Sequence, residues 1–202
     1  MKEYYYDKLL NIKTRGDQQG FNNSLHYHRY EPTPYGALEE LFKNYELKRC
    51  DRVVDFGCGK GRLNFFIHHL FDATVTGIEM NEIFYHEAVG NRKDYLKKAK
   101  KGSSSIHFLN CLAEQYEIDP SDNRFYFFNP FSIQVFMNVV NNILLSVENT
   151  PREVELILYY PSEEYVYFLE NHPSFDLKKE VRLPGVYEHN HNERFLLYKL
   201  AY

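Results

Sequence analysis

The chain has 202 residues, of which 44% are hydrophobic and 26% are charged, and its formal net charge is -4. This composition is typical of a globular domain that buries its own core. A mean hydropathy of -0.55 and the lack of an apolar run near ~18 residues exclude a membrane-spanning helix. The acidic balance gives no general attraction to phosphates, so strong nucleic-acid binding is not expected.

The cysteines and the opening residues indicate a compartment. Cys50, Cys58 and Cys111 are odd in number and never spaced as CxxC, which argues against a disulfide framework and against a thiolate zinc site. The first residues lack the apolar stretch and the cleavage site of a signal peptide. We therefore expect a cytoplasmic protein with reduced thiols and no metal site.

No linker or internal repeat divides the chain, so we expect a single domain over residues 1–202. Residues 1–34 are polar and aromatic with weak periodicity. We expect them to form an N-terminal lid or a substrate-recognition segment beside a catalytic core of residues 35–202. Apolar spacing predicts helices over 35–46, from Leu63 to Leu70, over 82–101, from Ile133 to Ile143 and over 162–171. Short apolar runs predict strands over 52–56, 73–80, 106–109, 125–128, 154–160, 175–183 and 194–201.

The order of these elements predicts the fold class. Strands that alternate with helices favour an α/β fold in which a seven-stranded, mostly parallel sheet carries helices on both faces. The last two strands have no helix between them, so we expect a C-terminal antiparallel hairpin at the sheet edge. In an open parallel sheet, ligands bind at the carboxyl ends of the strands.

A glycine-rich turn follows the first strand, with the sequence Asp55-Phe56-Gly57-Cys58-Gly59-Lys60-Gly61. A dinucleotide fingerprint, GxGxxG, would need its third glycine where Arg62 stands, so the turn has the wrong spacing for a nicotinamide cofactor. The Asp55 carboxylate at the strand end is a poor neighbour for a pyrophosphate but suits a ligand that carries an ammonium group. The glycines would let such a ligand touch the backbone.

A second acidic residue, Glu79, ends the second predicted strand, 24 positions after Asp55. A carboxylate there can accept hydrogen bonds from both hydroxyls of a ribose. The two acidic residues in this order are more specific than the glycines alone, although a glycine turn followed by a surface carboxylate is the simpler structural alternative.

With these features, the sequence from residue 33 to 202 resembles the class I S-adenosylmethionine-dependent methyltransferases, which have a Rossmann-like fold. The resemblance implies that the cofactor is S-adenosyl-L-methionine, with S-adenosyl-L-homocysteine as product. It also implies that the glycine turn lies against the methionine part of the cofactor, that Glu79 holds the ribose and that Met80 lies beside the adenine. Members often read the adenine through an acidic residue after the third strand, where this chain has Leu112. The implied cofactor contacts are Tyr35, Asp55, Gly57, Cys58, Gly59, Gly61, Glu79, Met80, Ala113, Glu114 and Asn129.

A candidate acceptor motif, Asn129-Pro130-Phe131, follows the fourth predicted strand. It is similar to the Asn-Pro-Pro-Tyr motif of methyltransferases that act on amide or adenine nitrogens, with one proline missing. The resemblance implies that the Asn129 oxygen and a backbone carbonyl accept hydrogens from a planar amine, that Phe131 stacks on its face, and that Asn129, Pro130 and Phe131 together orient the acceptor. These three residues are the candidate catalytic residues, and the alternative is an ordinary loop, where Asn and Pro are common.

Two further features have plain explanations. The basic run Arg92, Lys93, Lys97, Lys98, Lys100 and Lys101 could bind phosphates, but cations are also favoured at the carboxyl end of a helix. The histidine pairs lack a third metal ligand at a suitable spacing. Residues 27–35, which end at Tyr35, could fold over the crevice as a lid.

The sequence thus favours methyl transfer to a nitrogen acceptor of unknown class. Two alternatives remain open at this point. One is a cofactor-binding partner or regulatory subunit that has this fold without turnover of its own. The other is a nicotinamide-dependent oxidoreductase, which the position of Arg62 disfavours. The sequence predicts neither the acceptor nor the oligomeric state.

Overall fold

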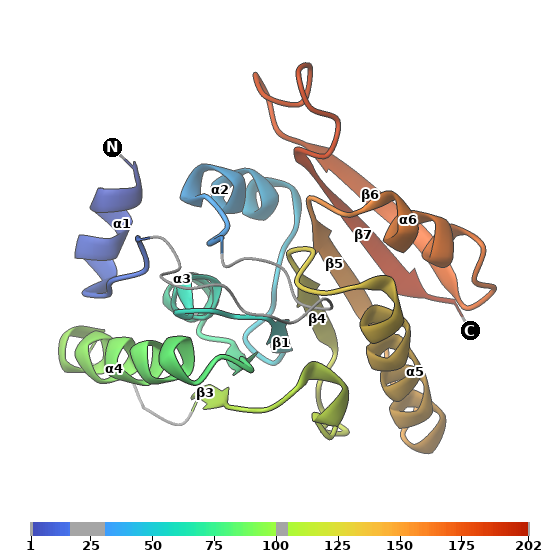
Figure 1. Cartoon of the computed structure of the whole chain (residues 1–202), viewed down its shortest axis with the longest axis horizontal. Helices are drawn as coiled ribbons and strands as arrows, with labels where there is room; N and C mark the ends of the chain where they lie inside the picture. The colour runs from blue at the N-terminus through green and yellow to red at the C-terminus, as the bar shows by residue number, and fades with distance from the viewer. Residues whose placement is uncertain (1, 17–30, 100–104, 202) are drawn as a thin grey trace.

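The strands of the computed structural model form one seven-stranded sheet (Figure 1). The structure describes residues 2–16, 31–99 and 105–201. The strands are β1 (Arg52–Phe56), β2 (Thr74–Ile78), β3 (Ile106–Leu109), β4 (Arg124–Phe127), β5 (Glu155–Tyr159), β6 (Phe175–Arg182) and β7 (Arg194–Leu200). Their order in the sheet is β3-β2-β1-β4-β5-β7-β6.

Strand directions agree with the predicted topology. Strands β1 to β5 pair in parallel, whereas β7 pairs antiparallel with both β5 and β6. Helices connect the parallel strands, as a crossover requires, and the short 183–193 connection joins β6 to β7. The predicted α/β fold with a C-terminal antiparallel hairpin is confirmed.

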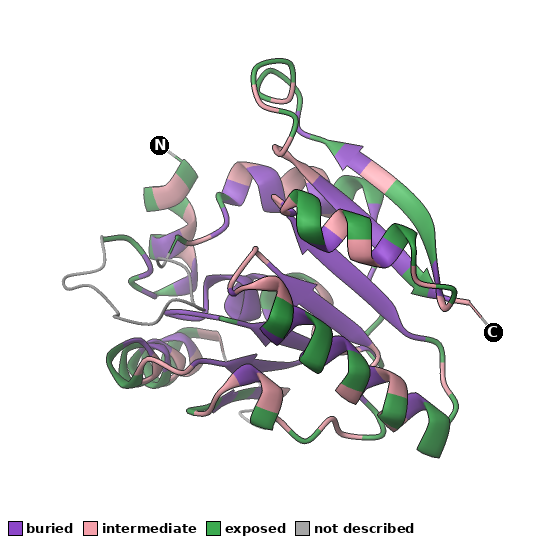
Figure 2. Cartoon of the chain, turned by 45° about the vertical axis from the view of Figure 1, so that its right-hand side comes forward, coloured by how far each residue is buried: buried purple, intermediate pink, exposed green. Residues whose placement is uncertain are grey.

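Helices cover both faces of the sheet (Figure 1). They are α1 (Lys2–Leu10), α2 (Tyr35–Asn44), α3 (Arg62–Phe71), α4 (Glu82–Ala99), α5 (Ile133–Asn149) and α6 (Glu163–Glu170), with a short 3-10 helix, η2, over Ala113–Gln115. Buried residues of α1, α2, α3 and α4 belong to the core on one face, and those of α5 and α6 belong to the core on the other. Figure 2 shows the buried residues along the strands and on the inner sides of the helices. Alternate side chains of each central strand thus enter opposite cores.

Helix α1 was not expected from the sequence, because its apolar residues have no helical spacing. Tyr4 and Tyr5 are exposed, whereas Asp7 and Leu10 are buried. Contacts with α2, α3 and α4, many of them polar, therefore stabilise this helix. Residues 2–16 of the expected N-terminal segment 1–34 are thus packed against the core. Of the expected lid over 27–35, residues 31–35 lead into α2, and residues 27–30 lie, with 17–26, outside the described residues.

Candidate functional site

The parallel order of β1 and β2 brings Asp55 and Glu79 to the same edge of the sheet. Asp55 pairs with Gly77 across the two strands, and Glu79 directly follows β2. Both side chains are buried, with exposed fractions of 4% and 7%. Burying two ionised carboxyl groups near each other costs free energy unless neighbouring groups bind or neutralise them.

The glycine turn between β1 and α3 has a backbone that L side chains rarely adopt. Gly57, Gly59 and Gly61 have φ angles of 76°, 54° and 82°, all in the left-handed region. The turn is fixed to β2, because the Gly57 and Cys58 N–H groups both donate to the Ile78 carbonyl at 2.9 and 3.1 Å. A Cβ on Gly61 would lie 2.6 Å from the Phe108 ring, so this glycine also permits the close packing of α3 on the sheet.

Glu79 is held by the backbone around it. One of its carboxylate oxygens accepts a hydrogen bond from the Gly59 N–H at 2.8 Å and the other from the Asn81 N–H at 2.8 Å. Burial raises the pKa of Glu79, and the backbone hydrogen bonds oppose that rise. The Asn110 amide donates to the Glu79 carbonyl at 2.8 Å, so the first residue after β3 fixes the end of β2.

Asp55 has a neutral partner rather than a cation among the contacts that the structure gives it. In the amide orientation that satisfies both groups, Asn64 of α3 donates to the Asp55 carboxyl at 3.0 Å and accepts from the Gly77 N–H at 3.3 Å. Burial, and then the nearby Glu79 carboxylate, raises the pKa of Asp55 to about 8. At neutral pH the free protein therefore holds mainly the protonated carboxyl.

The residues expected near an adenine lie at the same edge. Met80 follows Glu79, and Ala113 and Glu114 begin η2 after β3. Ala113 is buried and the other two are half-buried.

Cys58 is buried, and a Cβ on Gly77 would lie 2.6 Å from its sulfur, so the thiol packs against β2. Sequence reasoning missed Asn64 and Asn110, whose neighbours across the strands are visible only in the fold.

Asn129 follows β4 beside an aromatic cluster. Its φ angle is 39°, and Tyr160, which follows the neighbouring strand β5, has a φ angle of 48°. Positive φ is uncommon outside glycine and is often found at functional sites. The Phe128 ring lies 4.6 Å from Tyr159 and 6.4 Å from Tyr160 between ring centroids. Phe128 and Tyr160 are half-buried, so two rings near Asn129 remain accessible.

The expectation that Phe131 stacks on an acceptor is wrong. Its side chain is 1% exposed, its ring makes an edge contact with Phe127 at 6.2 Å, and its carbonyl accepts a hydrogen bond from the Tyr165 hydroxyl. Phe131 therefore belongs to the core under α5. Pro130 lies against the glycine turn instead, because a Cβ on Gly57 would be 2.7 Å from the Pro130 Cβ.

Tyr35 is not brought into this group either. Its side chain is fully buried, its hydroxyl donates to Asp7 at 2.8 Å, and its ring lies 4.5 Å from the Arg62 guanidinium. Tyr35 thus fills the space between α1 and α3. Its ring belongs to the inner, buried face of α2.

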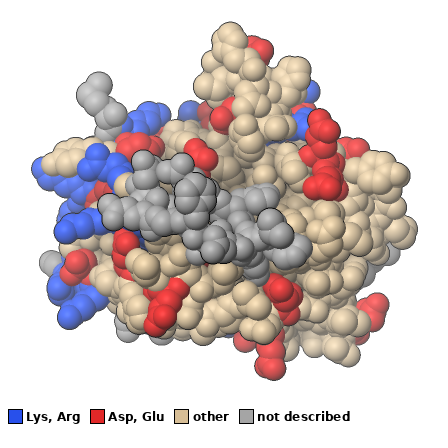
Figure 3. All heavy atoms as spheres, viewed as in Figure 1, with Lys and Arg blue, Asp and Glu red and all other residues tan. Residues whose placement is uncertain are grey.

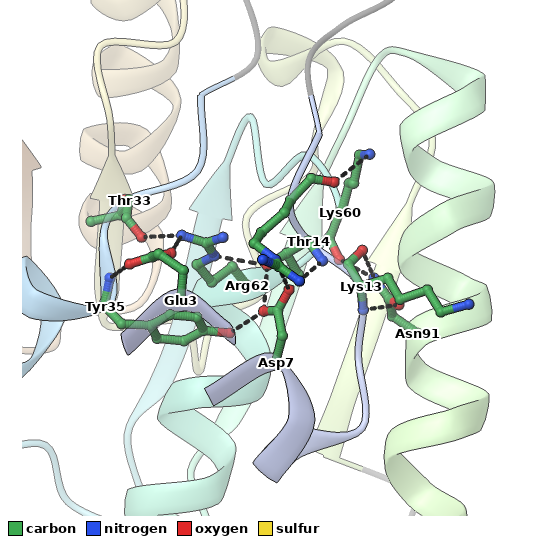
Figure 4. Close-up of polar contacts among 10 residues, drawn as sticks. Glu3, Asp7, Lys13, Thr14, Thr33, Tyr35, Lys60, Arg62 and Asn91 are labelled. Atoms are coloured by element: carbon green, nitrogen blue, oxygen red, sulfur yellow. Dashed lines mark hydrogen bonds and ion pairs between the residues drawn. The ribbon is translucent and has the colours of Figure 1, made fainter. Parts of the chain in front are cut away.

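A buried polar network joins the N-terminal region to the first turn of α3 (Figure 4). Arg62, next to the glycine turn, donates to the Thr14 hydroxyl at 2.8 Å and to the Thr33 carbonyl at 3.2 Å, and it forms an ion pair with Glu3. Asp7 accepts from both the N–H and the hydroxyl of Thr14 at 3.1 and 2.8 Å. Residues on both sides of 17–30 are therefore anchored on one arginine.

Only part of the predicted basic run lies on α4 as described, since Lys100 and Lys101 are outside the described residues. Lys97 forms an ion pair with Asp94 at 2.8 Å, and Lys98 donates to the Lys8 carbonyl at 3.0 Å. Within 2–16, 31–99 and 105–201, no group of three or more His, Cys, Asp or Glu residues could hold a metal ion. None of the helices in those ranges has the length and apolar character that a bilayer crossing requires.

Comparisons with known proteins agree on the fold. No family model matches the chain, and no curated protein matches it in sequence. Many solved structures do match. A protein from Pyrococcus horikoshii, solved as a proposed RNA methyltransferase, shares 14% identity with a TM-score of 0.60 over 100% of this chain and 99% of its own.

Two further structures are similar. A methyltransferase from Thiobacillus denitrificans, solved with S-adenosyl-L-homocysteine, has 14% identity and a TM-score of 0.56 over 84% of this chain and 92% of its own. An rRNA methylase from Streptococcus thermophilus has 14% identity and a TM-score of 0.54 over 81% and 93%. The chain therefore has the fold of the class I S-adenosylmethionine-dependent methyltransferases.

Proposed function

We propose that this protein is an S-adenosylmethionine-dependent methyltransferase that acts on a nitrogen acceptor. The observation that carries the proposal is the position of Glu79 and the glycine turn, side by side at the carboxyl ends of β2 and β1. Similar structures that were solved with S-adenosyl-L-homocysteine support the choice of cofactor.

The residues at this edge fit such a cofactor. Each Glu79 oxygen accepts one backbone N–H and has a second lone pair for a ribose hydroxyl. Gly59 carries no Cβ, so the methionine part can approach the backbone of the turn there, whereas Pro130 already fills the Cβ side of Gly57. Asp55 lies behind that turn, where a cationic ligand would favour its carboxylate form and offset the cost of its burial.

The cofactor would supply the methyl group, bonded to a positively charged sulfur, and this chain would bind and orient the acceptor. Asn129 follows β4, the strand next to β1, and its side-chain oxygen can accept a hydrogen bond from an acceptor N–H. The accessible rings of Phe128 and Tyr160 would contact the face of a planar amine or amide. The residues would thus accelerate transfer mainly by positioning, and the amine can lose its proton after attack.

Calorimetric titration with S-adenosyl-L-homocysteine tests the cofactor assignment. Glu79→Gln should weaken binding by about 1–3 kcal/mol, because a charge-assisted hydrogen bond to the ribose is lost. Glu82→Gln is the matched control, since Glu82 is an exposed carboxylate in the first turn of α4 and should leave affinity unchanged. Equal affinity of the Glu79→Gln variant and the native protein would refute the ribose contact.

Turnover separates an enzyme from a cofactor-binding partner. Transfer of a radiolabelled methyl group should be seen with a panel of amine, polypeptide and RNA acceptors. Binding of the cofactor without transfer to any member of the panel would favour the regulatory alternative. RNA belongs in this panel because the similar structures include proteins described as RNA and rRNA methyltransferases.

A further inference from the structure

Charge is distributed unevenly along the chain and over the surface. Between residues 125 and 177, Arg152 is the one Lys or Arg, whereas that span contains Glu148, Glu153, Glu155, Glu163, Glu164, Glu170 and Asp176. Figure 3 shows Lys and Arg gathered on the side of α1 and α4, with acidic side chains among them, whereas acidic side chains outnumber cations on the side of α6. The side of α6 therefore suits a partner that carries positive charge.

An open cavity of about 830 Å³ lies on the acidic side, around α6. Its lining includes Ile133 and Met137 of α5, and Val166, Tyr167 and Phe168 of α6. Tyr167 is 73% exposed and Met137 is 39% exposed. Large apolar side chains left exposed along one groove commonly mark an interaction site.

The groove begins where the proposed acceptor site ends. Pro161, which lines it, directly follows Tyr160, and Ile133 begins α5 three positions after Pro130. Both residues lie at the carboxyl ends of neighbouring strands, β5 and β4. A chain bound in the groove could therefore place one of its side chains beside Asn129.

The charges that line the groove are mainly negative. Glu163, Glu164 and Glu170 lie along it on α6, and its one arginine, Arg194, is paired with Glu180 at 2.8 Å. Phosphates would meet repulsion here, whereas Lys and Arg side chains would be attracted. Burial of the apolar residues would add a favourable contribution of about 25 cal/mol per Å².

We propose that this groove, lined by Ile133, Met137, Pro161, Glu163, Tyr167 and Glu170, docks a polypeptide segment that alternates basic and apolar side chains. The segment is the part of the acceptor that extends away from the methylated nitrogen. The inference rests on the proposed methyltransferase function and gives that function a substrate class. It also accounts for the location of the acidic α6 beside the acceptor edge.

Fluorescence anisotropy with three labelled probes tests the proposal. The first is a mixture of random 12-residue peptides built from Lys, Arg, Leu and Phe; the second replaces Lys and Arg with Asp and Glu; the third is a single-stranded RNA of 12 nucleotides. The first mixture should bind at least tenfold more tightly than the other two, and its affinity should fall as salt is raised.

Two sets of variants locate the binding. Tyr167→Ala combined with Glu164→Gln and Glu170→Gln should weaken binding of the basic mixture at least tenfold. Leu145→Ala combined with Glu148→Gln is the matched control, because it removes an exposed apolar side chain and a carboxylate from α5 outside the groove. This control should bind as the native protein does.

The proposal would be overturned by tighter binding of the RNA, by equal binding of both peptide mixtures, or by binding that the groove variants leave unchanged. The absence of binding by every probe would overturn it as well. Calorimetry with S-adenosyl-L-homocysteine on the same samples distinguishes the two proposals. If the native protein binds S-adenosyl-L-homocysteine but the groove test fails, only the polypeptide proposal is rejected. If the native protein does not bind S-adenosyl-L-homocysteine, the methyltransferase proposal itself is rejected.

Discussion

Gly57 and Pro130 are in contact across the sheet edge, so that a Cβ added to Gly57 would lie 2.7 Å from the Pro130 Cβ. Gly57 begins the turn after β1, and Pro130 lies in the turn after β4, the neighbouring strand. The glycine turn and the acceptor motif therefore share one boundary. A shift of either turn would move the other, which ties cofactor binding to the position of Asn129.

This contact predicts a cost for Gly57→Ala beyond that of backbone strain. Gly185 has a similar φ angle of 80°, with open space around it, whereas Gly57 has a φ angle of 76° and the proline contact. Gly185→Ala should cost about 1–2 kcal/mol, because an L side chain is strained in the left-handed region. Gly57→Ala should cost at least 1 kcal/mol more in urea unfolding and should also lower cofactor affinity. Equal effects of the two substitutions would show that the contact yields easily.

The raised pKa of Asp55 predicts a pH dependence of stability. Burial raises the pKa of Asp55 in the folded protein to about 8, whereas the unfolded group loses its proton near the ordinary pKa of 3.8. Between these values the unfolded state binds fewer protons, so stability should fall as pH rises, by at most about 1.4 kcal/mol per pH unit. Asp55→Asn should remove this contribution. The variant should gain stability relative to the native protein between pH 5 and pH 8 in urea titrations.

Asp94→Asn provides the control for that experiment. Lys97 lowers the pKa of Asp94 through a hydrogen bond, so its contribution is already complete above pH 5. The stability difference between Asp94→Asn and the native protein should therefore stay constant from pH 5 to pH 8. A flat difference for Asp55→Asn as well would mean that Asp55 is ionised in the folded protein.

The Arg62 network predicts that the N-terminal region depends on one side chain. Arg62→Met should destabilise the protein by about 3 kcal/mol, the low end for breaking a buried ion pair, because Glu3 is partly exposed. Lys2→Ala, which removes the exposed ion pair to Glu39, should cost less than about 1 kcal/mol. Hydrogen exchange of residues 2–16 in the two variants measures how far each substitution lowers the protection of this region. Unchanged protection of α1 in Arg62→Met would contradict the anchoring role.

The acceptor side predicts separate effects for Asn129 and Phe131. Asn129→Gly removes the amide and leaves glycine, which adopts a φ angle of 39° without strain. The variant should keep its cofactor affinity. Its kcat should fall about 10²-fold, by analogy with the loss of one preorganised hydrogen bond. Asn11→Gly, at a φ angle of 57° in the turn after α1, is the matched control. Full kcat in Asn129→Gly would remove the nitrogen assignment.

Phe131→Ala should behave as a core substitution instead. Its ring is 1% exposed, and removal of a buried aromatic side chain typically costs about 3–5 kcal/mol. Phe128→Leu should raise KM with little loss of stability, because the half-buried ring is offered to the acceptor. Thermal unfolding and steady-state kinetics of the two variants should therefore give opposite patterns.

The sequence alone determined the order of the strands and of the helices from α2 onward, the glycine turn and the placement of Asp55 and Glu79 at strand ends. These features follow from local patterns, because apolar periodicity and glycine positions act over a few residues. Parallel pairing then required that the ends of β1 and β2 meet at one edge.

Tertiary structure decided which aromatic residue beside Asn129 faces the solvent and which faces the core. Phe128 and Phe131 are three positions apart in an irregular turn, where no period predicts orientation, and the packing of α5 and α6 against β4 buries Phe131. The same holds for α1, whose apolar residues have only a weak helical pattern. Its polar residues Glu3 and Asp7 contact Arg62 and Tyr35, which are close to them only in the folded chain. Contacts between residues distant in sequence leave no local pattern, so these parts of the site depend on the fold.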